Sequence, residues 1–222
     1  MLLLFDIDGT LLLKAAGEHR EALHDAVREV YGVDVPDAEV PVAGRTDRAI
    51  VRSILELAGL DGARIDADAD AWVAAACAAY AKRCPEDLRR TLAPGAVAAL
   101  QELHAAGHEL SLVTGNLEPI ARLKLDRAGL GAFFPAGQGG FGSDREDRGA
   151  LPGLARERAG GRPRDATAVI GDTPLDIACA RADGVHCVAV ATGAYPADAL
   201  GDADAVVHGL GAVAGALAGL VA

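Results

Sequence analysis

Residues 2–11 read LLLFDIDGTL, and this stretch decides the fold. Its apolar run does not alternate with polar residues, which is typical of a strand that is covered on both faces of a parallel sheet. The run ends at two carboxylates, Asp6 and Asp8, and ligands bind at the carboxyl ends of strands in an open α/β sheet. We expect Asp6 and Asp8 to share one face there, with Gly9 turning the chain back. A simple turn is the alternative interpretation, since Asp-x-Asp-Gly also favours turns.

The other apolar runs predict further strands, and the longer Ala-rich stretches between them have helical spacing. These strands are expected at Glu109–Thr114, Ala168–Gly171, Cys187–Val190 and Ala205–Val207. Between Leu13 and Leu92 the pattern indicates helices alone, at Glu18–Tyr31, Asp47–Ala58 and Ala67–Arg83. We therefore predict an α/β fold whose core is a doubly wound, Rossmann-like parallel sheet. Residues 1–13 and 93–222 would form this core domain, and residues 14–92 an inserted helical domain.

The composition excludes several classes of protein. The chain has 222 residues, of which 51% are hydrophobic, so it can bury a sizeable core and is not intrinsically disordered. Its net charge of −11 repels nucleic acid and anionic lipid, and no apolar run reaches the ~20 residues of a membrane helix. The four cysteines lack zinc or disulfide spacing, and the segment before Asp6 does not resemble a signal peptide. We expect a cytoplasmic protein with reduced cysteines.

A second pair of carboxylates follows another predicted strand. Asp172 lies in the turn of the sequence GDTPLD (residues 171–176), and Asp176 comes about one helical turn later. Helix capping by Asp is the alternative interpretation. Together with Asp6 and Asp8, however, these side chains would form a cup of four carboxylates that repel one another unless a divalent cation is present. A small number of hard oxygen ligands with room for water suits Mg²⁺.

Two weaker signals mark candidate anion sites. Thr114, Gly115 and Asn116 come at the end of a predicted strand, and the Gly leaves backbone N–H groups open at the start of the next helix. A turn or helix cap is the alternative interpretation. Arg45 stands beside an expected turn in the helical insertion, where a basic side chain of this acidic protein could meet an anionic substrate.

The three motifs, in this order, resemble the haloacid dehalogenase-like (HAD) hydrolase superfamily, whose phosphatases begin with Asp-x-Asp-Gly-Thr, place Thr or Ser after the next core strand and end with Gly-Asp-x-x-x-Asp. The helical insertion resembles the superfamily's helical cap, and residues 44–47 (GRTD) are similar to a segment of the phosphoglycolate phosphatase-like branch. The resemblance implies a Mg²⁺-dependent phosphatase whose substrate is a small phosphorylated metabolite, phosphoglycolate-like or a sugar phosphate.

Carried over by position, the resemblance implies a role for each motif. Asp6 would attack phosphorus and form an aspartyl-phosphate, while Asp8 would act first as general acid and then as general base. Thr114 would bind a phosphoryl oxygen beside Gly115 and Asn116. Mg²⁺ would be held by Asp6, the backbone carbonyl of Asp8, Asp172 and, in part through water, Asp176.

One position departs from the family pattern. Enzymes of this kind carry a Lys, often followed by Pro, ahead of the last motif, but Gly142–Leu154 contains no Lys. Arg148 is the candidate to bind the phosphoryl group in its place, because a guanidinium supplies the same positive charge through a planar fork. Arg145 is the alternative, and a solvated charged loop would leave neither of them in the site.

Other functions are compatible with parts of this pattern. A phosphomutase similar to beta-phosphoglucomutase would keep every motif and differ in how the cap excludes water from the aspartyl-phosphate. A dehalogenase of this fold would need neither Asp8 nor a metal, and a signalling receiver domain would be shorter and lack the helical insertion. A non-catalytic phospho-acceptor or binding protein would be expected to lose Asp6 or Asp8. The motifs do not identify the substrate, and the oligomeric state is equally open.

Overall fold

The computed structural model describes residues 1–36 and 40–220. These residues form a parallel sheet of six strands in the order β3-β2-β1-β4-β5-β6. The strands are β1 (Leu2–Phe5), β2 (Glu109–Thr114), β3 (Gly140–Phe141), β4 (Thr167–Gly171), β5 (His186–Val190) and β6 (Ala205–Val207). The five strands that the sequence predicts are confirmed to within one residue. The edge strand β3 was not predicted, because a Gly-Phe pair carries no apolar pattern.

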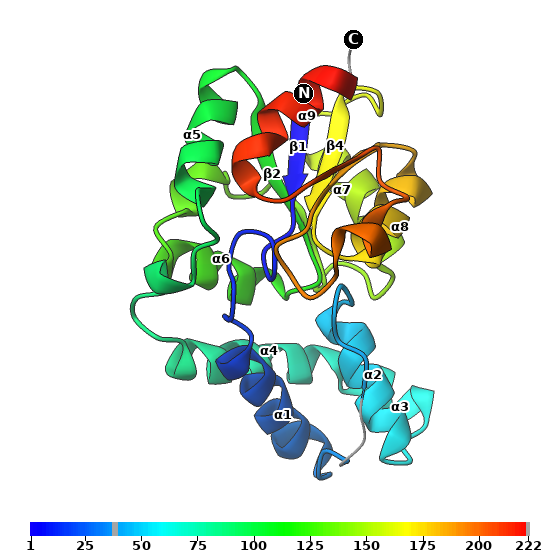
Figure 1. Cartoon of the computed structure of the whole chain (residues 1–222). Coiled ribbons are helices and arrows are strands. Elements are labelled where there is room, and N and C mark those ends of the chain that lie inside the picture. Colours follow the sequence, from blue (N-terminus) through cyan, green and yellow to red (C-terminus); the bar gives the residue numbers. More distant parts are fainter. Residues whose placement is uncertain (37–39, 221–222) are drawn as a thin grey trace.

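Apolar side chains of the central strand β1 point alternately to the two faces of the sheet. Leu3 and Phe5 belong to one hydrophobic core, and Leu2 and Leu4 belong to another. The first core contains side chains from α5 (Ala96–Ala105), α6 (Glu118–Arg127) and α9 (Val213–Leu220), and the second contains side chains from α7 (Leu151–Arg158) and α8 (Pro174–Asp183). Helices therefore cover both faces (Figure 1), which confirms the doubly wound α/β fold.

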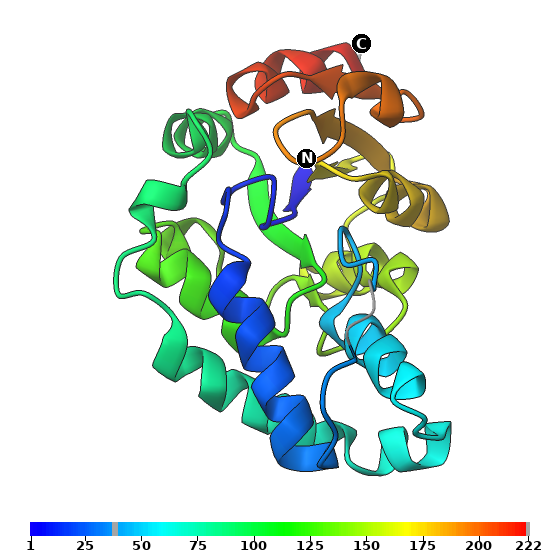
Figure 2. The same cartoon turned by 60° about the horizontal axis from the view of Figure 1, so that its bottom comes forward.

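Four helices precede the second strand and lie apart from the sheet. They are α1 (Gly17–Tyr31), α2 (Asp47–Leu57), α3 (Gly62–Ala67) and α4 (Ala69–Arg83), and we call residues 17–83 the helical segment. Figures 1 and 2 show it beyond the carboxyl end of β1, with α1 packed along α4. The short helix α3 was not predicted, because it buries a single apolar side chain, Ile65.

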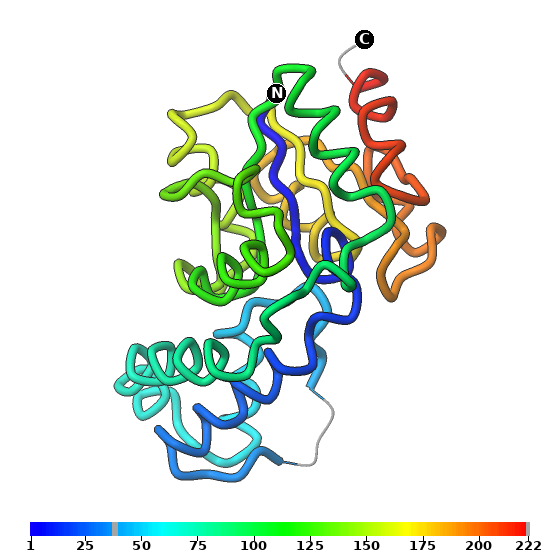
Figure 3. Tube along the Cα trace, turned by 90° about the vertical axis from the view of Figure 1, so that its left-hand side faces the viewer, coloured from blue at the N-terminus to red at the C-terminus, as the bar shows by residue number. Residues whose placement is uncertain are grey.

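Two neighbouring stretches of chain connect the helical segment to the sheet (Figure 3). Leu12 forms an antiparallel bridge with Leu92, and the amide of Ala93 donates to the carbonyl of Leu11 over 2.9 Å. The domain boundaries expected after residue 13 and before residue 93 fall at this paired crossing. The division into two domains stays a prediction.

Short 3-10 helices complete the described elements. They lie at Arg89–Thr91, Gly131–Phe133, Arg148–Ala150, Ala197–Leu200 and Leu210–Ala212. Within residues 1–36 and 40–220, no helix combines the length and the apolar character that are needed to cross a bilayer.

Candidate active site

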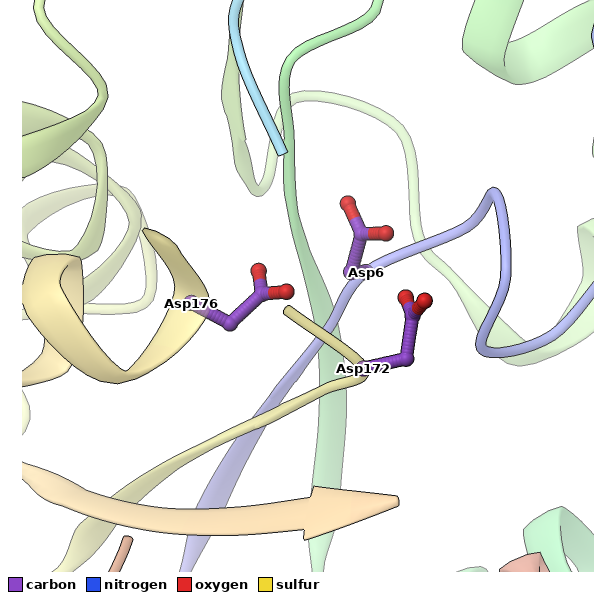
Figure 4. A group of neighbouring side chains, drawn as sticks. All are labelled: Asp6, Asp172 and Asp176. Carbon is purple, nitrogen blue, oxygen red and sulfur yellow. The ribbon is translucent and has the colours of Figure 1, made fainter. Parts of the chain in front are cut away.

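Three carboxylates meet where β1 and β4 end. Asp6 still continues the sheet, since its amide donates to the carbonyl of Ile170 over 2.9 Å. Asp172 follows β4 directly, and Asp176 lies in the first turn of α8. One oxygen from each of these carboxylates lies within 4.8 Å of the others, and Figure 4 shows the three side chains converging. The parallel register of β1 and β4 brings together carboxylates that are far apart in the sequence.

Asp176 serves both as a helix cap and as a member of this group. Its Oδ2 accepts hydrogen bonds from the amide and the hydroxyl of Thr173, over 3.0 Å and 2.7 Å. The hydroxyl of Thr173 in turn accepts from the amide of Asp176, which completes a capping box. The other oxygen, Oδ1, accepts from Arg148. The two interpretations of this aspartate, as a cap or as a site residue, are therefore compatible.

Arg148 lies among these carboxylates. Its guanidinium donates to Asp6 Oδ1 over 2.9 Å and to Asp176 Oδ1, and its Nε–H is buried without a partner among the described residues. Asp147 begins this turn, because its carboxylate accepts from the amide of Gly149. Arg145 instead is exposed and donates to the carbonyl of Asp144. The structure thus brings Arg148 into the site and leaves Arg145 outside it.

The three carboxylates carry more negative charge than one guanidinium offsets. The pKa of Asp6 is raised to about 8, mainly by burial and further by repulsion from Asp176 and Asp172. The positive charge of Arg148 offsets only part of this rise. Burial and repulsion from Asp176 also raise the pKa of Asp172 to about 7, although Asp172 accepts a hydrogen bond from the Thr10 hydroxyl. A further cation would relieve this repulsion. Three carboxylate oxygens at this spacing fit Mg²⁺.

Asp8 lies apart from this group, so the expected cup of four carboxylates contains three. Asp8 Oδ2 accepts from Lys124 Nζ over 2.6 Å and from Asn116 Nδ2 over 2.9 Å. Although burial alone would raise it, the pKa of Asp8 is lowered, mainly by the ammonium group of Lys124 and with help from His19. The buried ammonium of Lys124 thus pairs with this carboxylate, which is not among the three grouped ones. The expectation that all four side chains would form one group was wrong for this reason.

Lys124 is a buried charged side chain beside Asp8 that the motifs did not reveal. It is fully buried on α6, and its ammonium group donates to Asp8, Asn116 Oδ1 and His19 Nδ1. The sequence does contain a signal, since Lys124 stands four residues after Ile120 and therefore on the apolar face of its helix. A lysine almost never occupies such a position unless it is paired.

The segment after β2 lies between the sheet and the helical segment. Thr114 is fully buried, and its hydroxyl oxygen accepts from the amide and the side chain of Asn116. Gly115 and Asn116 line a pocket between the sheet and the helical segment. The anion that occupies the start of α6 is the carboxylate of Asp47, which accepts from the amide of Leu117 over 2.8 Å.

A pocket of about 850 Å³ lies between the sheet and the helical segment. Asp6, Asp8, Asp172 and Arg148 line its floor, and Arg45 lines its wall. The guanidinium of Arg45 donates to the carbonyls of Pro41 and Ala49 and to the hydroxyl of Ser53. Because a guanidinium has five N–H donors, Arg45 keeps donors for a ligand. The structure therefore brings most of the candidate site residues to one cavity, whereas Thr114 and Asp176 are fully buried and do not line it.

Comparisons with known proteins agree with this geometry. The family model described as haloacid dehalogenase-like hydrolase matches residues 3–181. The chain belongs to this family. The family match spans β1, the helical segment and most of α8, and it therefore includes Asp6 and Asp176. The resemblance that the three motifs indicated is confirmed.

Relatives of this HAD chain include phosphatases. It is 31% identical to a phosphoglycolate phosphatase from Rhodospirillum rubrum, over 86% of this chain and 79% of the relative. It is 30% identical to a phosphoglycolate phosphatase from Pseudomonas fluorescens, over 86% and 70%. These matches place the chain near the phosphoglycolate phosphatase-like branch.

Solved structures of the family share the fold of this HAD chain. A hydrolase from Pseudomonas syringae has a TM-score of 0.67 at 20% identity, with all of both chains covered. A beta-phosphoglucomutase from Clostridium difficile has a TM-score of 0.68 at 17% identity, with 94% of this chain and 91% of that chain covered. At these identities the likeness shows the fold alone.

Proposed function

We propose that this chain is a Mg²⁺-dependent phosphatase that hydrolyses a small phosphorylated metabolite through an aspartyl-phosphate on Asp6. The observation that carries the proposal is the contrast between Asp6 and Asp8 in one pocket. Asp6 lies beside two carboxylates and Arg148, and Asp8 lies on Lys124. A divalent cation bound among the three carboxylates would lower the pKa of Asp6 and keep it ionised as a nucleophile, while Asp8, held apart on Lys124, is left to carry the proton.

In the first step, a carboxylate oxygen of Asp6 attacks phosphorus while the bond from phosphorus to the leaving oxygen breaks. Asp8 gives its proton to that oxygen, and the alcohol departs. In the second step, Asp8 takes a proton from water, the water attacks phosphorus, and the bond from Asp6 to phosphorus breaks. Inorganic phosphate is released and Asp8 is protonated again. The lowered pKa of Asp8 favours the carboxylate that the second step requires, and the negative charge of a bound phosphate would raise this pKa toward the protonated form that the first step requires.

The residues that would hold Mg²⁺ are Asp6, Asp172, Asp176 and the backbone carbonyl of Asp8. Both oxygens of Asp176 already accept hydrogen bonds, which supports contact in part through water. Within residues 1–36 and 40–220, Asp172 accepts a side-chain hydrogen bond from Thr10 alone. When bound, the ion supplies positive charge that reduces repulsion between the substrate phosphate and the carboxylates.

The other candidate residues would bind the substrate. The unpartnered Nε–H of Arg148 supports a contact with the phosphoryl group beside Asp6. Thr114, Gly115 and Asn116 would complete this contact from the end of β2. Arg45 on the pocket wall would meet the leaving group, and residues 14–92 would act as a cap that excludes water.

The names of the relatives support phosphoglycolate as the first substrate to assay, with sugar phosphates next. The experiment measures phosphate release from each compound by the purified chain, with and without Mg²⁺, beside an Asp6→Asn control. Release that needs both Mg²⁺ and Asp6 supports the proposal. An isomeric sugar phosphate without phosphate release would favour the phosphomutase alternative, and no reaction on either class would contradict both.

A further inference from the structure

Lys14 has an unusual backbone conformation beside the pocket. Its φ angle is 60°, and within residues 1–36 and 40–220 it is the one residue other than glycine with a positive φ. The left-handed region is unfavourable for a residue with a Cβ atom, and lysine lacks the short polar side chain through which Asn and Asp tolerate it. A glycine would adopt the same conformation without strain. The backbone alone therefore does not favour a lysine at this position.

Contacts on both sides of Lys14 impose this conformation. The amide of Leu13 donates to the carbonyl of Thr91 over 2.6 Å, and Ala15 is buried in the hydrophobic core. The chain therefore enters and leaves residue 14 in fixed directions. Strain of this kind persists where the surrounding structure determines it, and strained residues cluster at functional sites.

Lys14 lies close to the first pair of carboxylates. The amide of Gly9 donates to the carbonyl of Leu12 over 2.8 Å, and Leu12 forms a bridge with Asp8, so the chain after Asp8 turns back toward it. Lys14 follows Leu12 by two residues, which places the two Cα atoms within about 8 Å of each other. Lys14 and Asp8 both line the pocket. The long side chain of a lysine at this position can reach a group that is joined to phosphorus through a few atoms.

The ammonium group of Lys14 is available to a ligand. The side chain is exposed at the pocket, and it has no hydrogen bond or ion pair within the described parts of the chain. Two other cations of the pocket, Arg148 and Arg45, already donate to partners in the protein. Because the protein has a net charge of −11, a cation on this wall creates a local preference for an anion. An ammonium group only donates hydrogen bonds, which suits a carboxylate.

We propose that Lys14 is a specificity-determining residue that binds an anionic group, such as a carboxylate, on the leaving alcohol of the substrate. The inference rests on the proposed function, in which Asp8 gives a proton to that alcohol. The anion belongs to the part of the substrate that departs, so Lys14 acts on the choice of substrate and not on the transfer of the phosphoryl group. The substrate class is thus a phosphate monoester of a hydroxy acid.

The experiment compares the wild type with Lys14→Met on phosphoglycolate, ethyl phosphate and phosphoethanolamine in the presence of Mg²⁺. The three leaving groups are similar in size and carry a negative charge, no charge and a positive charge. In Lys14→Met, we expect kcat/KM to fall roughly 10-fold for phosphoglycolate, to change less than about 2-fold for ethyl phosphate and to rise roughly 2-fold for phosphoethanolamine. The loss on phosphoglycolate should lie mainly in KM, because binding is what the ammonium group supplies. Lys14→Arg should retain most of the wild-type value.

Two further variants separate recognition from damage to the fold. Lys82→Met is the matched control, since Lys82 is exposed on α4 and does not line the pocket, and it should leave all three probes unchanged. Lys14→Gly should lose phosphoglycolate hydrolysis as Lys14→Met does. Its melting temperature should equal or exceed that of the wild type, because glycine adopts the left-handed conformation without strain.

Changes of equal size on the three probes, or no change, in Lys14→Met would overturn the inference. A wild-type protein that hydrolyses ethyl phosphate with no preference for phosphoglycolate would overturn it as well, and so would a lower melting temperature in Lys14→Gly. A wild-type protein that releases phosphate from none of these probes and from no sugar phosphate would contradict the proposed function instead, so the two failures are distinct.

Discussion

Asp6 and Asp8 stand two residues apart and lie in opposite electrostatic surroundings. At Asp6, burial and two neighbouring carboxylates raise the pKa to about 8 in spite of Arg148. At Asp8, Lys124 lowers the pKa in spite of burial. The comparison teaches that the neighbours, and not the residue type, set the pKa of each carboxylate within one motif.

The largest effects are expected from removing each carboxylate. Asp6→Asn and Asp8→Asn should each reduce kcat below detection, at least ~1,000-fold, because one removes the nucleophile and the other the proton carrier. Their melting temperatures should differ, since Asp8→Asn leaves the charge of Lys124 buried and uncompensated, whereas Arg148 keeps Asp176 in Asp6→Asn. Steady-state kinetics and thermal melts check both. A wild-type kcat in Asp6→Asn would exclude the covalent route.

On the Asp6 side, Arg148 should matter next. Arg148→Ala should lower kcat/KM roughly 100-fold or more, because its charge acts where the phosphoryl group is transferred and water is excluded. Arg148→Lys should recover part of this through its positive charge, despite losing the planar fork. Arg145→Ala is the control and should change kcat/KM little, since Arg145 is exposed. A deep loss in Arg145→Ala with a normal Arg148→Ala would contradict the placement of the site.

Metal removal tests the group of three carboxylates. A chelator should abolish turnover, and Mg²⁺ should restore it. In a Mg²⁺ titration of activity, Asp172→Ala should weaken the affinity for the ion by roughly 100-fold and Asp176→Ala by about 10-fold, because Asp176 already binds Arg148 and Thr173. Full activity in the chelator would revive the metal-free dehalogenase alternative.

The smallest expected effect is on stability. The pKa values of Asp6 and Asp172, about 8 and about 7, lie well above the ordinary value of an aspartate, so the folded state keeps protons that the unfolded chain has lost. The free energy of unfolding should therefore fall as pH rises from 6.5 to 8.5 without metal, lowering the melting temperature by roughly 5 °C. The decrease should be smaller in Asp6→Asn, and Mg²⁺ should raise the melting temperature most at pH 8.5. A metal-free melting temperature that rises over this range would contradict the raised pKa values.

Local pattern was sufficient to predict most of the fold. Continuous apolar runs such as Leu2–Phe5 predict buried parallel strands, and parallel strands end at one edge of the sheet. For that reason Asp6 and Asp172 could be assigned to one site from their positions after two predicted strands. The edge strand Gly140–Phe141 and the helix Gly62–Ala67 were out of reach, because each is short and has little apolar pattern. The cytoplasmic location stays a prediction.

The sequence alone determined which residue types stand at the ends of the strands, because that depends on neighbours within a few positions along the chain. Only the tertiary structure decided which cation each carboxylate meets. Asp6 and Arg148 are 142 positions apart, and Asp8 and Lys124 are 116 positions apart. Contacts of this range depend on how α6, α8 and the helical segment pack around the sheet, and electrostatic effects depend on distance in space. For that physical reason the four carboxylates that the motifs predict as one group are divided in the folded chain. Asp6, Asp172 and Asp176 lie with Arg148, and Asp8 lies with Lys124.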